Sequence, residues 1–362
     1  MTRDVHQVDT VIIGAGAIGL AIARELANNN ASPSLYVLEQ HARSGEEVSS
    51  HNSGVIHAGI YYPTHSLKAR LCVQGNRLLY RYAALNRLPF KQLGKLIVAK
   101  ASQRKELEAL FQQGLNNGVQ GLTWLEQDAL QALEPNVTAN IAIQSSTTGI
   151  IDAPAFVQQL ELDASAQGAH ILFRHQVIRI KAIHNGYELY INHEFYLHCR
   201  CLINAAGLSA GKFSSEQNSY FAQGQYFTYQ APSPFSQLIY PLPEKNHQGL
   251  GVHSTIDMHE QLHFGPDVQY MPTVDYHFDE NRKHHFAQAI RQYFPALDVD
   301  KLKPGQVGVR PKISAENQPA KDFHISKTSN GRGALITLMG IESPGLTASL
   351  AIGQYVRELL NE

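Results

Sequence analysis

Two cations stand close together near the C-terminus, in the segment Val309-Arg-Pro-Lys312. Because side chains alternate along a strand, Arg310 and Lys312 lie on one face if this segment is extended. A guanidinium holds a carboxylate through two parallel hydrogen bonds, and a second cation beside it suits a dicarboxylate. The alternative is a pair of solvent-facing charges at the end of a strand.

A proton acceptor for such an acid is also available. Two of the 18 histidines, His57 and His253, stand inside motifs. Histidine has an unperturbed pKa near ~6.5, which suits a general base. Each of the two can instead be a structural histidine, and Tyr226 can either donate a hydrogen bond from a pocket wall or fill the core. A cation that binds a carboxylate and a base that accepts a proton are together typical of a site that acts on a small carboxylic acid.

The sequence Gly14-Ala-Gly16-Ala-Ile-Gly19 indicates a dinucleotide-binding turn. It stands between an apolar run typical of a strand and an apolar helical segment, where Gly14 makes a tight turn, Gly16 admits a pyrophosphate and Gly19 allows close packing. Glu39 ends the next predicted strand, where a carboxylate accepts hydrogen bonds from a ribose. The dinucleotide contacts that we predict here are Gly14, Gly16, Ala17, Ile18, Gly19 and Glu39.

The elements that position these residues form two layers. Strands are predicted at 10–13, 35–38, 95–99, 141–144, 306–313 and 334–339, and helices at 17–27, 66–86, 103–116, 126–133, 155–166, 280–293 and 347–360. Short strands with a hairpin turn at Asn185-Gly186 are predicted between 170 and 204, and an antiparallel sheet between 221 and 265. The fold class is therefore α/β (α+β overall), a Rossmann-like layer interleaved with a mostly antiparallel layer.

Composition excludes several classes of function. The chain has 30 Lys and Arg against 31 Asp and Glu, so it lacks the basic surface of a nucleic-acid-binding protein. Its three cysteines have no Cys-x-x-Cys spacing, and no zinc motif is present. No signal peptide or membrane span is expected, which predicts a cytoplasmic protein for which peripheral membrane contact remains open.

The small polar residues at 49–62, directly after Glu39, favour FAD over NAD, because such a loop can run along an extended FAD. Here the sequence resembles the FAD-dependent L-2-hydroxyglutarate dehydrogenases and oxidases of the D-amino-acid-oxidase-like superfamily. The resemblance rests on residues 49–62, 67–75, 91–98, 203–208, 249–253, 264–266, 308–312 and 340–347.

The resemblance implies a set of FAD contacts in addition to the glycine motif and Glu39. They are Ser50, Asn52, Ser53, Gly54, the backbone of Val177, Ala206, Gly207, Gly340, Gly345, Leu346 and Thr347. It also implies that Arg310 holds the substrate carboxylate and that His253 lines the substrate face of the flavin. His253 is the preferred base, and His57 is the second candidate. The helix that begins near Gly345 would stabilise negative charge on the reduced ring through its N-terminus.

Domain boundaries follow from the same motifs. Residues 1–90, 136–215 and 305–362 are predicted to bind FAD, and residues 91–135 and 216–304 to bind substrate. One segment departs from the family, because Gln223-Gly-Gln225-Tyr-Phe227 stands where the relatives carry an Arg-Gly-Glu-Tyr-Tyr-like segment. If the missing charges recognise a distal carboxylate, the substrate differs from L-2-hydroxyglutarate.

The leading hypothesis is an FAD-dependent enzyme that oxidises a small L-2-hydroxy acid, first of all L-2-hydroxyglutarate to 2-oxoglutarate, by hydride transfer to flavin N5. Electrons then pass to oxygen, a quinone or another carrier. One alternative is an amino-acid or amine oxidase of the same superfamily, because hydride loss from carbon is common to both reactions. Another is a flavin-binding protein without turnover, which the presence of Arg310, Lys312 and His253 argues against.

Overall fold

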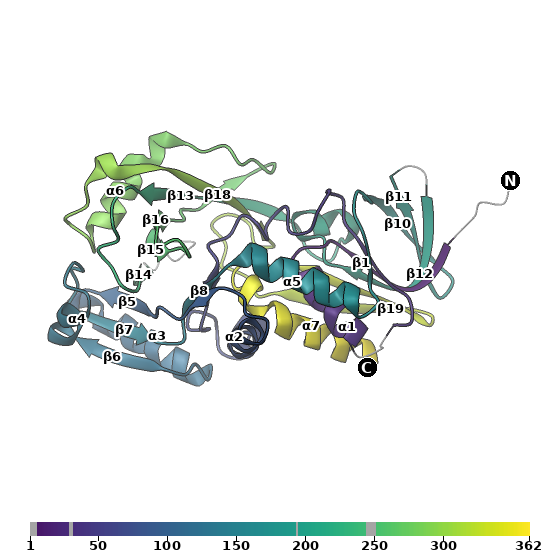
Figure 1. The fold of residues 1–362 in the computed structure, drawn as a ribbon, viewed down its shortest axis with the longest axis horizontal. Coiled ribbons are helices and arrows are strands. Elements are labelled where there is room, and N and C mark those ends of the chain that lie inside the picture. The colour runs from purple at the N-terminus through teal and green to yellow at the C-terminus, as the bar shows by residue number, and fades with distance from the viewer. Residues whose placement is uncertain (1–5, 29–31, 193–194, 244–250) are drawn as a thin grey trace.

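An eight-stranded sheet forms one half of the molecule (Figure 1). The computed structural model describes residues 6–28, 32–192, 195–243 and 251–362. The strands of this sheet are β1 (His6–Ile13), β2 (Leu35–Leu38), β9 (His170–Leu172), β10 (Val177–Ile183), β11 (Gly186–Ile191), β12 (Phe195–Asn204), β19 (His324–Asn330) and β20 (Gly333–Met339). β1 lies between β2 and β12 and is parallel to both. The carboxyl ends of these strands therefore meet at one edge, and the expected Rossmann-like layer is confirmed.

Four helices pack together on this half (Figure 1). They are α1 (Ala17–Asn28), α2 (Leu67–Leu85), α5 (Ala153–Ala166) and α7 (Gly345–Asn361). Most residues of α1 are buried, since α5 and α7 both contact it. The crossing of α1 and α7 is close: a Cβ atom at Gly353 would lie 2.7 Å from the Ala21 carbonyl oxygen. Side-chain caps at Ser66 and Asp152 fix the starts of α2 and α5.

A five-stranded antiparallel sheet forms the upper part of the other half in Figure 1. Its strands are β13 (Tyr220–Tyr229), β15 (His253–Ile256), β16 (Leu262–Gly265), β17 (Gln269–Met271) and β18 (Leu302–Lys312). Helix α6 (Lys283–Arg291) covers its apolar face, where the Phe286 and Phe227 rings meet with centroids 4.9 Å apart. This sheet confirms the antiparallel layer.

A four-stranded sheet lies below, at the lower left of Figure 1. It contains β5 (Lys95–Ala99), β6 (Leu122–Glu126), β7 (Ile141–Ser145) and β14 (Leu238–Pro241), with α3 (Arg104–Asn116) and α4 (Gln127–Leu133) beside it. A small sheet of β3 (Val55–Ile56), β4 (Phe90–Lys91) and β8 (Gly149–Ile151) joins the two halves. Short 3-10 helices are η1 (Ala101–Gln103), η2 (Gly207–Phe213), η3 (Glu280–Arg282) and η4 (Val299–Lys301).

One strand pairs differently from the expectation. β14 was expected in the antiparallel sheet, but it pairs in parallel with β5. Of the segments predicted to bind FAD, 136–215 contains β7, which pairs with β5 and β6, and 305–362 contains most of β18, which pairs with β13. The reason is that hydrogen-bonded pairing joins strands far apart in the sequence, which local patterns do not encode.

Among the described residues, no helix is both long and apolar enough to cross a bilayer.

Candidate active site

A cavity of about 1110 Å³ lies between the two halves of the molecule. One end is lined by the carboxyl ends of β1 and β2 and the start of α1, and the other end by β13, β14, β15 and β18. Its volume exceeds the usual ~300–1,000 Å³ of small-molecule sites, as expected for a dinucleotide together with a substrate.

The glycine motif forms a close-fitting turn at the first end. Gly14 has φ +101°, a conformation that favours glycine, and a Cβ atom at Gly19 would lie 1.9 Å from the Gly14 carbonyl oxygen. A Cβ atom at Gly16 would lie 2.9 Å from Ser49 Oγ. Gly14, Gly16, Ala17 and Ile18 line the cavity, whereas Gly19 serves the packing of the turn. The backbone is thus open to a pyrophosphate at the N-terminus of α1.

Glu39 lies at the end of β2, where its carboxylate lines the cavity. Its two oxygens accept hydrogen bonds from the backbone N–H groups of Ala15 and His41, each at 2.8 Å. A carboxylate has further lone pairs beyond these two bonds. Glu39 is therefore held in place and can still accept ribose hydroxyls.

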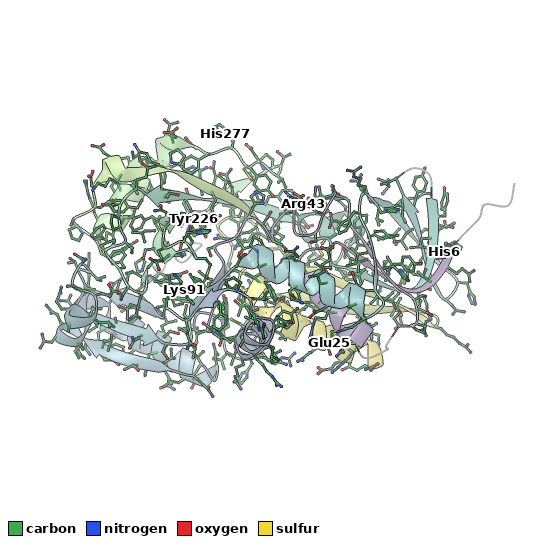
Figure 2. All side chains as sticks on the ribbon, in the orientation of Figure 1. His6, Glu25, Arg43, Lys91, Tyr226 and His277 are labelled. Carbon is green, nitrogen blue, oxygen red and sulfur yellow. The ribbon has the colours of Figure 1, made fainter. Side chains whose placement is uncertain are left out.

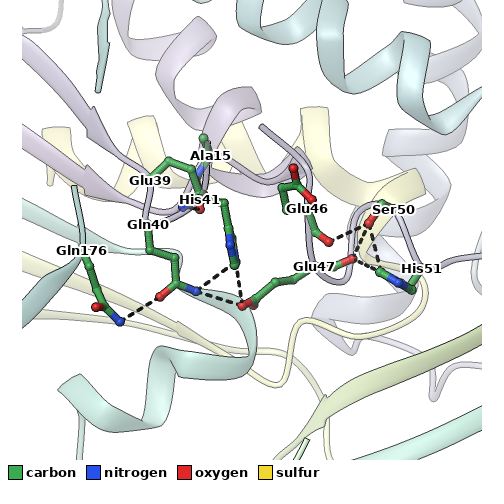
Figure 3. A network of polar contacts seen from close by, with 9 residues as sticks. All are labelled: Ala15, Glu39, Gln40, His41, Glu46, Glu47, Ser50, His51 and Gln176. Atoms are coloured by element: carbon green, nitrogen blue, oxygen red, sulfur yellow. Dashed lines mark hydrogen bonds and ion pairs between the residues drawn. The ribbon is translucent and has the colours of Figure 1, made fainter. Parts of the chain in front are cut away.

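A polar network holds the loop that follows Glu39 (Figure 3). The Glu47 carboxylate accepts from Gln40 Nε2 at 2.8 Å and lies 3.1 Å from His41 Nε2. The Glu47 backbone oxygen accepts from Ser50 Oγ at 3.0 Å and lies 2.9 Å from His51 Nδ1. The loop therefore satisfies several of its polar groups within itself, and its residues line the cavity wall.

This network includes Ser50, one of the residues predicted to contact FAD. The Ser50 hydroxyl donates to the carbonyls of Glu46 and Glu47, and Ser50 does not line the cavity. Ser49 lines it instead, and its Oγ accepts from the Ala17 N–H at 2.9 Å. Ser49 and Ser50 are adjacent and identical, so the sequence alone could not show which of them lines the cavity.

The ends of β12 and the start of α7 complete the cofactor part of the wall. Among the residues for which the resemblance implies FAD contacts, those that line the cavity are Asn52, Ser53, Gly54, Val177, Ala206, Gly207, Gly345, Leu346 and Thr347. Gly340 does not line it, because it turns the chain at φ +67° against Ile313. Thr347 is buried, and its Oγ1 accepts from the His57 N–H at 3.0 Å, which joins α7 to the loop containing His57.

Arg310 and Tyr226 lie together at the second end of the cavity. Burial raises the pKa of the Tyr226 hydroxyl, and the nearby positive charge of Arg310 opposes that rise. In Figure 2 Tyr226 lies inside the molecule, beneath the ribbon formed by β13 and β18. Within the described part of the chain, Arg310 forms no salt bridge with a carboxylate. Its charge is therefore available to an anionic ligand.

Lys312 faces the same cavity but has a partner. Its Nζ lies 3.1 and 3.0 Å from the two Glu342 oxygens, and Lys68 Nζ lies 3.1 Å from the first of them. All three groups line the cavity wall. The nearby Lys68 and Lys312 cations hold the pKa of Glu342 below its usual range despite burial. Lys312 is thus part of a Lys68–Glu342–Lys312 cluster with one excess positive charge and is not the free second cation that strand alternation predicts.

His253 has the geometry of a proton acceptor. Its Nδ1 lies 3.0 Å from the Gly251 carbonyl oxygen, which makes Nδ1–H the donor and leaves Nε2 unprotonated. Its ring stacks on Tyr240, with centroids 3.8 Å apart. Burial, followed by the positive charge of Arg310, lowers its pKa well below the usual histidine value. Residues 249 and 250 of the motif that ends at His253 lie outside the described residues.

His57 lines the cavity from another element. Its Nε2 lies 3.2 Å from Ser343 Oγ, and its backbone oxygen accepts from Asn76 Nδ2 at 2.9 Å. Burial and then the charges of Lys95 and Arg310 lower its pKa to about 3. Both candidate bases are therefore neutral at ordinary pH and lie on one wall with Arg310.

The two glutamines that depart from the family lie outside the cavity. Gln223 Nε2 donates to the backbone oxygens of Asp275 and His277, and Gln225 exchanges two hydrogen bonds with the backbone of Asp279. In Figure 2 His277 lies at the outer edge, on the opposite side of the ribbon from Tyr226. Strand alternation directs Gly224 and Tyr226 to the cavity and the two glutamines away from it. The loss of charge at these positions therefore does not alter the cavity wall.

Several cavity residues were not predicted from the sequence. Tyr61, Tyr62, Lys68, Tyr240, Tyr270, Glu342 and Ser343 line the wall. Tyrosines and paired charges are common in any core or surface, so only the three-dimensional arrangement singles them out. Within the described residues, no group of His, Cys, Asp and Glu side chains is arranged to hold a metal ion.

Comparison with known proteins decides the family. Residues 9–359 match the family described as DAO, FAD dependent oxidoreductase. The chain belongs to this family. Its cofactor is FAD, and the glycine turn, Glu39 and the ordered loop fit an extended dinucleotide.

Named relatives agree with this assignment. The chain is 36% identical to the mitochondrial L-2-hydroxyglutarate dehydrogenase of Arabidopsis thaliana, over 97% of this chain and 83% of the relative. It is 34% identical to the enzyme of the same name from Pongo abelii, over 97% and 86%. The structure resembles that of L-alpha-glycerophosphate oxidase from Mycoplasma pneumoniae with FAD bound, with a TM-score of 0.85, 25% identity and coverage of 99% and 96%. This FAD-dependent oxidoreductase therefore has relatives that act on CH–OH donors, and it uses a small-molecule substrate and an electron acceptor.

Proposed function

We propose that the protein oxidises an L-2-hydroxy dicarboxylic acid, L-2-hydroxyglutarate first of all, to the 2-oxo acid. The observation that carries the proposal is the juxtaposition of Arg310, without a carboxylate partner among the described residues, and His253 with an unprotonated Nε2. The two named dehydrogenase relatives support the same substrate.

In this proposal Arg310 binds the carboxylate next to the reacting carbon through paired hydrogen bonds. The Tyr226 hydroxyl, which lines the same cavity as Arg310, orients the same group. The Lys68–Glu342–Lys312 cluster, with its excess positive charge, faces the distal carboxylate. The two ends of a dicarboxylate thus meet positive charge, and the hydroxyl-bearing carbon lies between them.

His253 Nε2 accepts the proton of the hydroxyl group as the carbonyl forms. FAD supplies the acceptor for the hydride that leaves the α-carbon. His57 lies on the same wall and is the second candidate for the base. Tyr61, Tyr62 and Tyr240 line the same cavity and give this part of its wall an aromatic surface.

Anaerobic mixing of the FAD-loaded protein with L-2-hydroxyglutarate tests the proposal. Loss of the visible absorbance band of oxidised FAD is expected with the L enantiomer and not with the D enantiomer. L-lactate, which lacks the distal carboxylate, should reduce FAD far more slowly at equal concentration.

L-glutamate is the second comparison, because it has the same two carboxylates and an amino group in place of the hydroxyl. Reduction by L-glutamate with release of ammonia, and none by L-2-hydroxyglutarate, would replace the proposal with an amino-acid oxidase. Reduction by neither compound would remove the dicarboxylate assignment.

A further inference from the structure

Lys95 is a buried cation that the proposed chemistry does not use. It begins β5, its residue is 1% exposed, and it forms no salt bridge within the described chain. Its Nζ lies 4.6 Å from the ring centroid of Tyr61 and 4.7 Å from that of Tyr240. Aromatic faces attract a cation, but an unpaired buried ammonium remains costly. The cost of burying this ammonium suggests that Lys95 has a role beyond packing.

The rings around Lys95 also form the cavity wall. Tyr61 and Tyr240 line the cavity, whereas Lys95 lies behind them and does not. The Tyr240 ring stacks on His253 with an interplanar angle of 21°. Lys95, Tyr240 and His253 are thus in sequence, with the Tyr240 ring between the Lys95 ammonium and the His253 ring.

The charged and titratable groups around the two histidines come from several elements. Lys95 on β5 and Arg310 on β18 act on both His57 and His253, and His57 acts on His253. Cys72 on α2 lies near Lys95, and burial raises its pKa, so the thiol stays neutral. Burial likewise raises the pKa of Tyr61, Tyr62, Tyr226 and Tyr240, so these hydroxyls also stay neutral. Two positive charges therefore oppose protonation of the histidines.

Substrate binding changes the balance between those two charges. A bound carboxylate neutralises Arg310, and a carboxylate beside a histidine favours the charged imidazolium. Lys95 is separated from the cavity by aromatic rings, so no ligand in the cavity pairs with it directly. Its positive charge therefore persists in the complex.

We propose that Lys95 is a positioning residue for the reaction: its ammonium, held between Tyr61 and Tyr240 behind the cavity wall, keeps His57 and His253 in the neutral, proton-accepting form when a substrate carboxylate has neutralised Arg310. This inference rests on the proposed function for its role in turnover, but its effect on the histidines exists without substrate.

The pH range of the effect follows from the group itself. Burial lowers the pKa of Lys95 to about 7. Its ammonium form predominates as pH falls below that value. His57, with a pKa of about 3, takes up its proton only in this acid range, where Lys95 is charged.

The test compares FAD-loaded wild-type protein with Lys95→Met, Lys95→Arg and the control Lys91→Met. Lys91 is a lysine four residues earlier whose ammonium pairs with Glu260 at the surface, 2.9 Å away. Ring ¹⁵N shifts of the histidines are followed against pH by NMR, with His57→Asn and His253→Asn used to assign the signals. Flavin absorbance confirms the FAD content of each variant.

In Lys95→Met, His57 or His253 should titrate roughly one pH unit higher than in wild-type protein, because a nearby like charge has been removed. The acid limb of kcat/KM should move upward by the same amount. Lys95→Arg keeps the positive charge at position 95, and Lys91→Met leaves Lys95 unchanged. The histidine titrations and pH profiles of both variants should therefore match those of wild-type protein.

Identical histidine titrations in wild-type protein and Lys95→Met, at normal FAD content, would overturn the proposal and leave Lys95 as a space-filling residue. If Lys95→Met does not fold, Lys95→Gln is read in the same way. Failure of the proposed function is a separate result: the FAD of wild-type protein would not be reduced by L-2-hydroxyglutarate. In that case the NMR comparison of wild-type protein with Lys95→Met still tests the effect of Lys95 on the histidines.

Discussion

Arg310 is the residue on which substrate affinity is expected to depend most. Replacing it with Ala removes the paired hydrogen bonds to a carboxylate that remains buried, a loss of about 2–4 kcal/mol or roughly 30- to 1,000-fold in kcat/KM. Arg310→Lys should recover only part of this loss, because an ammonium cannot form the planar paired contact.

Steady-state kinetics of FAD-loaded variants measure the effect. Arg332, exposed in the turn between β19 and β20, supplies the matched control, and Arg332→Ala should stay within about twofold of wild-type protein. An Arg310→Ala enzyme with wild-type kcat/KM would exclude Arg310 from the binding of the substrate.

The two cavity histidines determine the pH dependence. Burial and nearby positive charge lower the pKa of His57 to about 3 and that of His253 well below its usual value. The neutral form is the base, so activity is present above the lowered pKa and is lost only as pH falls toward it. We therefore expect kcat/KM to show no single-proton decline near ~6.5. A profile measured from pH 5 to 8 that falls with an apparent pKa near that value would assign the base to an exposed group.

Among elements, β13 separates two roles by the alternation of its side chains. Gln225 is fully buried and holds both the N–H and the C=O of Asp279, whereas Tyr226 faces the cavity. Gln225→Ala leaves these backbone groups without partners and should lower the free energy of unfolding by about 1–3 kcal/mol. KM for L-2-hydroxyglutarate should not change.

Tyr226→Phe is the control for that experiment, because it changes the neighbouring side chain on the opposite face of the strand. It should raise KM or lower kcat and leave the melting temperature nearly unchanged. A Gln225→Ala protein with normal stability and altered substrate preference would restore the idea that this position selects the substrate.

Some of these elements could be predicted from the sequence, and others could not. The glycine turn, Glu39 and the helix at Gly345 were predictable because each depends on local backbone geometry and a short motif. The pairing of β14 with β5 was not, since it joins residues about 140 positions apart and leaves no local signal. The pairing of Lys312 with Glu342 was not predictable either. The alternation of side chains along a strand fixes the face on which Lys312 lies, but not the residue from another loop that lies beside it.

In the whole molecule, the cavity runs from the Rossmann-like sheet to the antiparallel sheet. Glu39 and the glycine turn lie at one end, and Arg310, Tyr226 and His253 lie at the other. Because several elements from both halves line this one cavity, a ligand that fills its length binds only when the halves are folded together. Ligand binding should therefore stabilise the whole chain and not one half alone.

This coupling predicts a difference between FAD and its shorter relative FMN. FAD added to deflavinated protein at about 100 times its Kd should stabilise the fold by about 2.7 kcal/mol, seen as a higher Tm in calorimetry. FMN lacks the adenosine part that Glu39 and the Gly14 turn are placed to bind, so at equal concentration it should raise Tm much less. Glu39→Gln weakens the acceptor for ribose hydroxyls and should reduce the FAD effect toward that of FMN without changing the FMN effect. Equal rises of Tm with FAD and FMN would mean that the adenosine end of the cavity contributes nothing to binding, and that the two halves are coupled through the flavin end alone.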